Sequence, residues 1–214
     1  MDVAAERRQR LAAAVLYALT PELEPQALME WVQRACSSGI EMLQLRHKRL
    51  TRRQLFEVAA PIGRICRSQG MMLIVNDFVD LAMTIGADGV HLGQEDLPLP
   101  VARRLLGPEM VIGVSAGTVE SVLAADDEGA DYIGAGPLFA TPVKADKAPV
   151  GPQWVALLSA ISKLPVFAIG GIDSENLESV VGAGVRRVCV GRGMGMIDDI
   201  VARGRLMRQI LDSP

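Results

Sequence analysis

The sequence is poor in cysteine, in excess charge of either sign and in long hydrophobic runs. Cys36, Cys66 and Cys189 are odd in number and far apart, which excludes a disulfide framework and a closely spaced cysteine metal site. The chain has 22 Lys and Arg against 25 Asp and Glu, a formal charge of −3, which argues against a general nucleic-acid binder. We therefore expect a protein of the reducing cytoplasm with no nucleic acid as partner.

No apolar run approaches the roughly 18 residues that span a bilayer, so we expect no membrane partner. The longest run, Leu11–Leu19, follows an arginine-rich segment and so imitates a short secretion signal. Acidic residues dilute that segment, and Thr-Pro-Glu-Leu-Glu-Pro follows where a small-residue cleavage site is needed. We interpret Leu11–Leu19 as a first buried strand and residues 1–10 as a flexible or helical extension.

Half of the residues are apolar, enough for a sizeable core, and they form short runs separated by helix-like stretches. The runs are near-continuously apolar, as expected for parallel strands covered on both faces. They are Val15–Thr20, Ile40–Arg46, Met71–Asn76, Gly89–Leu92, Val111–Ser115, Tyr132–Gly136, Val166–Gly170 and Arg187–Gly191. The clearest helical stretches are Gln26–Cys36, Leu55–Cys66, Thr118–Glu128, Pro152–Ser162, Ser174–Val181 and Ile197–Leu211.

Eight strand-like runs, each followed by a helix-like one, predict a parallel α/β fold. We expect a single (β/α)8 barrel domain over residues 1–214, with an open doubly wound sheet as the alternative. No Pro/Ser-rich linker divides the chain. In a barrel of this kind, function belongs at the carboxyl ends of the strands.

The second run ends in polar residues that alternate onto one side: Gln44, Arg46 and Lys48. Two cations at one strand end can bind a diphosphate, Arg through its planar fork and Lys as a point charge. Further arginines follow in the sequence, so a solvated basic turn remains the alternative at this point.

Two acidic residues follow neighbouring runs. Asn76 ends the third run and Asp77 follows it, while the fourth run continues into the segment His91–Asp96, which ends at Asp96. Such hard oxygen ligands suit Mg²⁺, which usually takes one or two carboxylates plus substrate phosphates. The alternatives are that Asp77 caps the next helix and that Asp96 is a turn residue. For His91, a packed, hydrogen-bonded role is favoured over acid–base catalysis.

The last strands end in glycines: Gly170–Gly171 after the seventh and Gly191–Arg192–Gly193 after the eighth. Glycines there let backbone amides approach an anion, so we predict a phosphate site. The long polar stretch 138–151, with Thr141 and Lys144, is either a lid over the reactants or a surface loop. The sequence thus predicts two anion sites, one at the Arg and Lys side chains and one at the glycines. Two such sites indicate an enzyme that joins two phosphorylated small molecules or expels diphosphate from one of them.

These motifs resemble the thiamine-phosphate synthase family. The resemblance rests on Gln-Leu-Arg-x-Lys at 44–48, Asn-Asp at 76–77, His-Leu-Gly-Gln-Glu-Asp at 91–96, the block 129–141, Lys144 and Ala-Ile-Gly-Gly-Ile at 168–172. It implies a Mg²⁺-dependent transferase of thiamine biosynthesis. The enzyme would couple 4-amino-2-methyl-5-(diphosphooxymethyl)pyrimidine with a thiazole phosphate, giving thiamine phosphate and diphosphate.

The resemblance also implies a role for each matching residue. Arg46, Lys48 and Lys144 would be catalytic, and Asp77 and Asp96 would bind Mg²⁺. The pyrimidine diphosphate would be held by Gln44, Arg46, Lys48, Asn76, Ser115 and Lys144. The thiazole phosphate would be held by Thr141, Gly171, Gly191 and Arg192.

The chain departs from the family pattern mainly on the thiazole side, at Gly117, Val143 and Arg192, while Phe78 replaces a common arginine. A sister family with the same barrel, a thiazole tautomerase, relies on a histidine where this chain has Gly117. A tautomerase-like paralogue, a non-catalytic binder of thiamine phosphate and a synthase with a changed second substrate are therefore the alternatives. The sequence neither predicts nor excludes a homo-oligomer.

Overall fold

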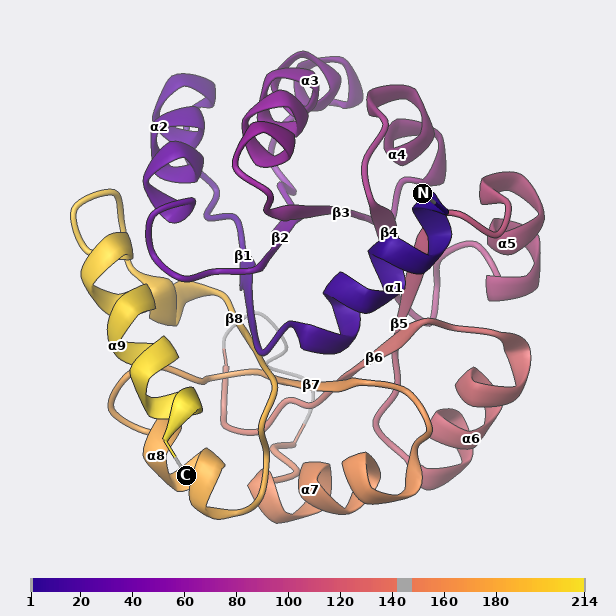
Figure 1. Cartoon of the computed structure of the whole chain (residues 1–214), viewed down its shortest axis with the longest axis vertical. Helices are drawn as coiled ribbons and strands as arrows, with labels where there is room; N and C mark the ends of the chain where they lie inside the picture. Colours follow the sequence, from indigo (N-terminus) through magenta and orange to yellow (C-terminus); the bar gives the residue numbers. More distant parts are fainter. Residues whose placement is uncertain (1, 142–147, 214) are drawn as a thin grey trace.

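The computed structural model describes residues 2–141 and 148–213 and forms one closed barrel of eight parallel strands (Figure 1). The strands follow one another around the barrel in sequence order, and β1 pairs with β8 to close it. The predicted (β/α)8 barrel is confirmed, and the open sheet is excluded.

The strands lie within the predicted runs. They are β1 Leu16–Leu19, β2 Met42–Leu45, β3 Met72–Asn76, β4 Gly89–Leu92, β5 Val111–Ser115, β6 Tyr132–Ala135, β7 Val166–Ile169 and β8 Val188–Val190. The helices are α1 Val3–Ala13, α2 Pro25–Ala35, α3 Arg52–Ser68, α4 Val79–Ile85, α5 Leu99–Leu106, α6 Val119–Glu128, α7 Pro152–Ile161, α8 Leu177–Gly182 and α9 Ile200–Asp212, with a short 3-10 turn η2 Arg192–Met194.

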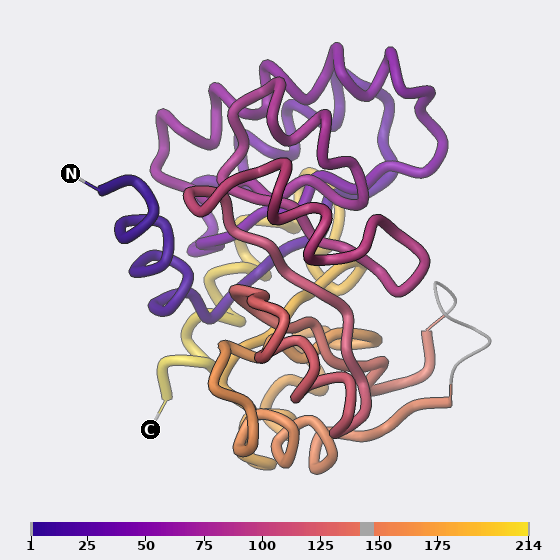
Figure 2. The backbone as a smooth tube through the Cα atoms, turned by 90° about the vertical axis from the view of Figure 1, so that its right-hand side faces the viewer, coloured from indigo at the N-terminus to yellow at the C-terminus, as the bar shows by residue number. Residues whose placement is uncertain are grey.

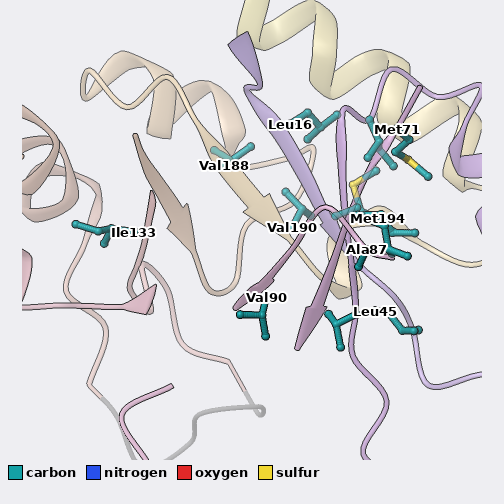
Figure 3. Close-up of a cluster of buried hydrophobic side chains, with 14 of the residues drawn as sticks. Leu16, Leu45, Met71, Ala87, Val90, Ile133, Val188, Val190 and Met194 are labelled. Carbon is teal, nitrogen blue, oxygen red and sulfur yellow. The ribbon is translucent and has the colours of Figure 1, made fainter. Parts of the chain in front are cut away.

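Alternation along each strand divides the apolar side chains between two cores. On β1, Tyr17 points into the barrel, where it meets Phe167 and Tyr132, while Leu16 packs outward against the helices. Figure 3 shows members of this outer core on several strands, Leu16 and Val188 among them. Side chains filling the inside of the barrel leave the strand ends as the place for a site.

The run Leu11–Leu19 is not strand throughout, so that prediction is wrong in its first part. Helix α1 continues to Ala13, and only β1 is strand. Figures 1 and 2 show α1 lying across one end of the barrel. Leu11 packs there into the inner core, and the Arg7 Nε lies 3.2 Å from Asp88. Contacts with residues far along the chain therefore decide the conformation of this run.

Helix α8 begins at Leu177 rather than at the predicted Ser174. The Asp173 carboxylate accepts hydrogen bonds from the amides of Glu175 and Asn176, at 3.0 and 3.1 Å, and holds this segment in a turn. Asp173 thus caps the turn that precedes the helix. No helix within residues 2–141 and 148–213 has the length and apolar composition needed to cross a membrane.

Candidate active site

The polar residues predicted at the strand ends gather at one end of the barrel, opposite α1. The segments on either side of residues 142–147 project from this end in Figure 2. The residues fall into two groups: charged side chains after β2, β3 and β4, and a glycine-lined cavity after β6, β7 and β8.

Asp77 and Asp96 meet through a hydrogen bond between their side chains. Asp77 follows β3 in the left-handed conformation, with φ 64°, and its amide donates to the His91 carbonyl at 2.9 Å. Helix α4 has Phe78 as its N-cap without a side-chain cap, so the alternative role of Asp77 as a helix cap is wrong. Asp96 accepts from the Gly93 amide at 2.6 Å and thus also stabilises its own turn.

Burial raises the pKa of Asp77 to about 6, and the hydrogen bond and negative charge of Asp96 add to this effect. The positive charges of Arg46 and Lys48 act in the opposite direction. The structure therefore brings the end of β2 close enough to Asp77 for the charges of Arg46 and Lys48 to act on this carboxylate. This arrangement favours the predicted anion and cation site over a merely solvated basic turn.

Replacing Asp77 by asparagine is expected to remove a pH dependence of stability. Without divalent ions, the folded protein keeps a proton on Asp77 up to about pH 6, whereas its ordinary pKa is 3.8. Between these pH values, the folded state binds more protons than the unfolded state. The contribution of Asp77 to the free energy of unfolding therefore falls as pH rises from about 4 to about 6. Thermal unfolding in EDTA should show this decline in the original protein and a weaker one in Asp77→Asn; parallel curves contradict the raised pKa.

Arg46 is held by a residue that the sequence did not single out. The Thr20 hydroxyl accepts from the Arg46 amide and donates to the Arg46 carbonyl, both at 2.9 Å. The side chain of His47 turns away, toward the Leu23 carbonyl and the Leu50 amide. In the sequence, the only sign that Thr20 holds the Arg46 backbone is its hydroxyl group at the end of a predicted strand.

Gln44 and Ser115 are joined through the inside of the barrel. Gln44, only 3% exposed, donates from Nε2 to the Tyr17 hydroxyl at 2.6 Å. Ser115 ends β5, and its Oγ lies 3.1 Å from His91 Nε2. His91 is thus hydrogen-bonded, as the favoured interpretation required. Asn76, half-buried, ends β3 in register with His91.

A cavity of about 280 Å³ lies beyond β6, β7 and β8. Its lining contains four residues predicted for the thiazole phosphate: Thr141, Gly171, Gly191 and Arg192. Gly171 has φ 70°, and a Cβ there would lie 2.7 Å from the Cβ of Phe139, so this position requires glycine. Leu19, Ile169 and Cys189, which the sequence did not point to, also line the cavity.

Lys144 and Val143 lie outside the described residues, as does the centre of the stretch 138–151. The parts on either side of it pair with each other. The Val150 amide donates to the Pro137 carbonyl at 2.9 Å, and the Gly151 amide donates to the Leu138 carbonyl at 3.1 Å. The base of this segment therefore stands beside the cavity.

Comparison with known proteins decides the family. The profile described as thiamine monophosphate synthase matches residues 16–194. The chain belongs to the thiamine monophosphate synthase family. The predicted resemblance is thereby confirmed, and the matched range runs from the first residue of β1 to the end of η2.

Similar proteins support the assignment to the thiamine monophosphate synthase family. A thiamine-phosphate synthase of Gloeobacter violaceus is 45% identical over 193 residues, which are 90% of this chain and 56% of that protein. One of Moorella thermoacetica is 42% identical over 86% of this chain and 88% of its own length. The chain thus spans little more than half of some curated relatives. A solved structure, thiamine phosphate pyrophosphorylase from Pyrococcus furiosus, is 32% identical with a TM-score of 0.83, covering 96% of this chain and 97% of the other.

Proposed function

We propose that this chain couples 4-amino-2-methyl-5-(diphosphooxymethyl)pyrimidine with a thiazole phosphate and releases thiamine phosphate and diphosphate. One observation carries the proposal. Asp77 is paired with Asp96 and lies within reach of the Arg46 and Lys48 charges, at the end of the barrel that also holds the glycine-lined cavity. The relatives bear the name of this activity.

The reaction needs no protein nucleophile. The carbon that carries the diphosphate is benzylic-like, and the amino group of the pyrimidine ring stabilises a cation there. Arg46 and Lys48 hold and neutralise the leaving diphosphate, which lowers the barrier to its departure. The thiazole nitrogen then attacks the cation. Holding both reactants in line can supply up to roughly 7–11 kcal/mol of barrier lowering.

Asp77 and Asp96 fit magnesium. Mg²⁺ binds one or two protein carboxylates and completes its shell with phosphate oxygens and water. The two carboxylates share a hydrogen bond, and burial together with the negative charge of Asp96 raises the pKa of Asp77. Since the site offers two carboxylates, diphosphate oxygens and water would complete the shell. The bound ion would neutralise charge that develops on the leaving group.

The remaining predicted residues have places consistent with this reaction. Gln44, Asn76 and Ser115 belong to β2, β3 and β5, where the pyrimidine would lie beside its diphosphate. Lys144 is assigned to the diphosphate by the family resemblance alone. Three free thiols agree with a reducing cytoplasm as the location.

Arg192→Ala is expected to weaken binding of the thiazole phosphate about tenfold, since a charge-assisted hydrogen bond to phosphate is lost. Arg192 is exposed and lines the cavity, on the turn after β8. Calorimetric titration of the thiazole phosphate measures the effect. The control is Arg186→Ala, an exposed arginine that precedes β8 and lies 3.5 Å from the Ser213 carbonyl. Equal affinity of the two variants for the thiazole phosphate would show that Arg192 is a surface arginine with no part in binding this ligand.

The proposal is tested by mixing the pyrimidine diphosphate, the thiazole phosphate and Mg²⁺. Thiamine phosphate and diphosphate should appear in equal amounts. A thiazole tautomerase would instead change the isolated thiazole without releasing diphosphate. A non-catalytic binder would hold the reactants without turnover. Either of these results overturns the proposal.

A further inference from the structure

A continuous line of hydrogen bonds crosses the inside of the barrel beneath the candidate active site. It links Gln44, Tyr17, Tyr132, His91 and Ser115, which come from strands β2, β1, β6, β4 and β5. The successive distances are 2.6, 3.0, 3.1 and 3.1 Å. Both ends are residues that the proposed function assigns to the pyrimidine.

The interior of the barrel is shaped around this line. Tyr17 and Tyr132 are at most 1% exposed, and their rings meet edge to face, 5.9 Å apart. A Cβ on Gly113 would lie 2.0 Å from the ring of Tyr132, so glycine makes the space that this ring occupies. A Cβ on Gly134 would lie 3.1 Å from the ring of His91.

Burial keeps both phenols protonated, because it raises the pKa of Tyr17 and of Tyr132 well above the ordinary value. Each hydroxyl therefore carries one hydrogen, and a buried hydrogen without an acceptor is costly. Once the donor of one terminal hydrogen bond is known, the donor and acceptor of every other bond in the line are therefore fixed.

We propose that Tyr17, Tyr132 and His91 are positioning residues that fix which atoms donate and which accept at the pyrimidine. The Gln44 amide nitrogen donates to Tyr17, so Tyr17 donates to Tyr132 and Tyr132 donates to Nδ1 of His91. His91 then carries its hydrogen on Nε2 and donates to Ser115. This inference rests on the proposed function for the identity of the ligand.

The consequence appears at the two ends of the line. Gln44 is left with its carbonyl oxygen as an acceptor beside its second amide hydrogen, and Ser115 is left with its hydroxyl hydrogen as a donor. An aminopyrimidine offers the complement, a donating amino group next to an accepting ring nitrogen. If the line ran the other way, the Ser115 hydrogen would point to His91 and the Gln44 carbonyl oxygen to Tyr17, so this complement would be lost.

Nitrogen NMR of the histidine side chains tests the direction without any substrate. The chain has two histidines, and His47 serves as an internal reference. Its Nδ1 accepts from the Leu50 amide and its Nε2 faces the Leu23 carbonyl, so it also carries the hydrogen on Nε2. At slightly alkaline pH, both side chains should show the Nε2–H form. A His91 ring with the hydrogen on Nδ1, or doubly protonated, overturns the proposal.

Tyr132→Phe tests the link to the substrate, because it removes one oxygen and keeps the ring. We expect the KM for the pyrimidine diphosphate to rise about tenfold, on the scale of one buried hydrogen bond. The KM for the thiazole phosphate and the signal of His47 should not change, while the signal of His91 should shift. An unchanged KM for the pyrimidine diphosphate contradicts the positioning role.

Phe167→Leu is the matched control. Phe167 packs against Tyr17 and Tyr132, with ring centres 5.5 and 5.7 Å away, but has no hydrogen-bonding group. It should lower thermal stability and leave the KM and the His91 form intact. An equal rise of KM in Phe167→Leu shows a packing effect and overturns the proposal. Absence of diphosphate release in the original protein would overturn the proposed function, whereas the NMR result decides the direction of the line by itself.

Discussion

Asp77→Ala is expected to lower turnover at least about a hundredfold, the scale of losing one group that stabilises developing charge. Asp77 shares a hydrogen bond with Asp96 and lies within reach of the Arg46 and Lys48 charges. Removal of one carboxylate leaves half of the proposed magnesium site, and charge on the departing diphosphate is then less well neutralised. Steady-state release of diphosphate at saturating substrates and Mg²⁺ measures the effect.

Asp80→Ala is the matched control for Asp77→Ala. Asp80 lies three residues further along, is exposed and pairs with Arg52 on the outside of the helices. Its loss should leave turnover close to normal. Lys144→Ala is expected to show a loss similar to that of Asp77→Ala. Near-normal rates in both Asp77→Ala and Lys144→Ala contradict the roles given to these residues.

Asp131→Ala is expected to lower the free energy of unfolding by about 3–5 kcal/mol, the range for breaking a buried ion pair. The Asp131 side chain is 7% exposed and accepts from Arg8 at 3.1 Å, from the Ile112 amide at 2.8 Å and from Arg103. These contacts join α1 and α5 to the start of β5 and β6. The substitution therefore loosens the end of the barrel that α1 covers, which lies opposite the candidate active site.

Urea unfolding measures this loss of stability. The control is Asp198→Ala, because Asp198 is 95% exposed and lies 3.5 Å from Arg34. A substitution at such a surface position should change the free energy of unfolding by no more than about 0.5 kcal/mol. A similar small change for Asp131→Ala would show that the buried cluster does not hold α1 in place.

The barrel could be predicted because buried parallel strands read as short apolar runs. All eight predicted runs contain a strand of the barrel. The prediction failed at Leu11–Ala13, where a short apolar run suits a strand and a buried helix equally well. The helix there depends on α1 contacts such as Arg7 with Asp88, which the local sequence does not encode.

The candidate site was predictable where polar residues break an apolar run at its end. Asp77 and Asp96 follow adjacent strands, so topology alone brings them together. The line through Tyr17 and Tyr132 was missed, because these residues are 115 positions apart and each reads as an ordinary core aromatic. Their pairing depends on the closure of the barrel and on the space left by Gly113.

The most direct test of the account is the effect of Mg²⁺ on the binding of inorganic diphosphate, measured by calorimetric titration. The predicted result is at least about tenfold tighter binding with Mg²⁺ than in EDTA, with this gain lost in Asp77→Asn and in Asp96→Asn. Diphosphate that binds the original protein equally well with and without the ion would contradict the claim that the two aspartates and a divalent cation together hold the leaving group.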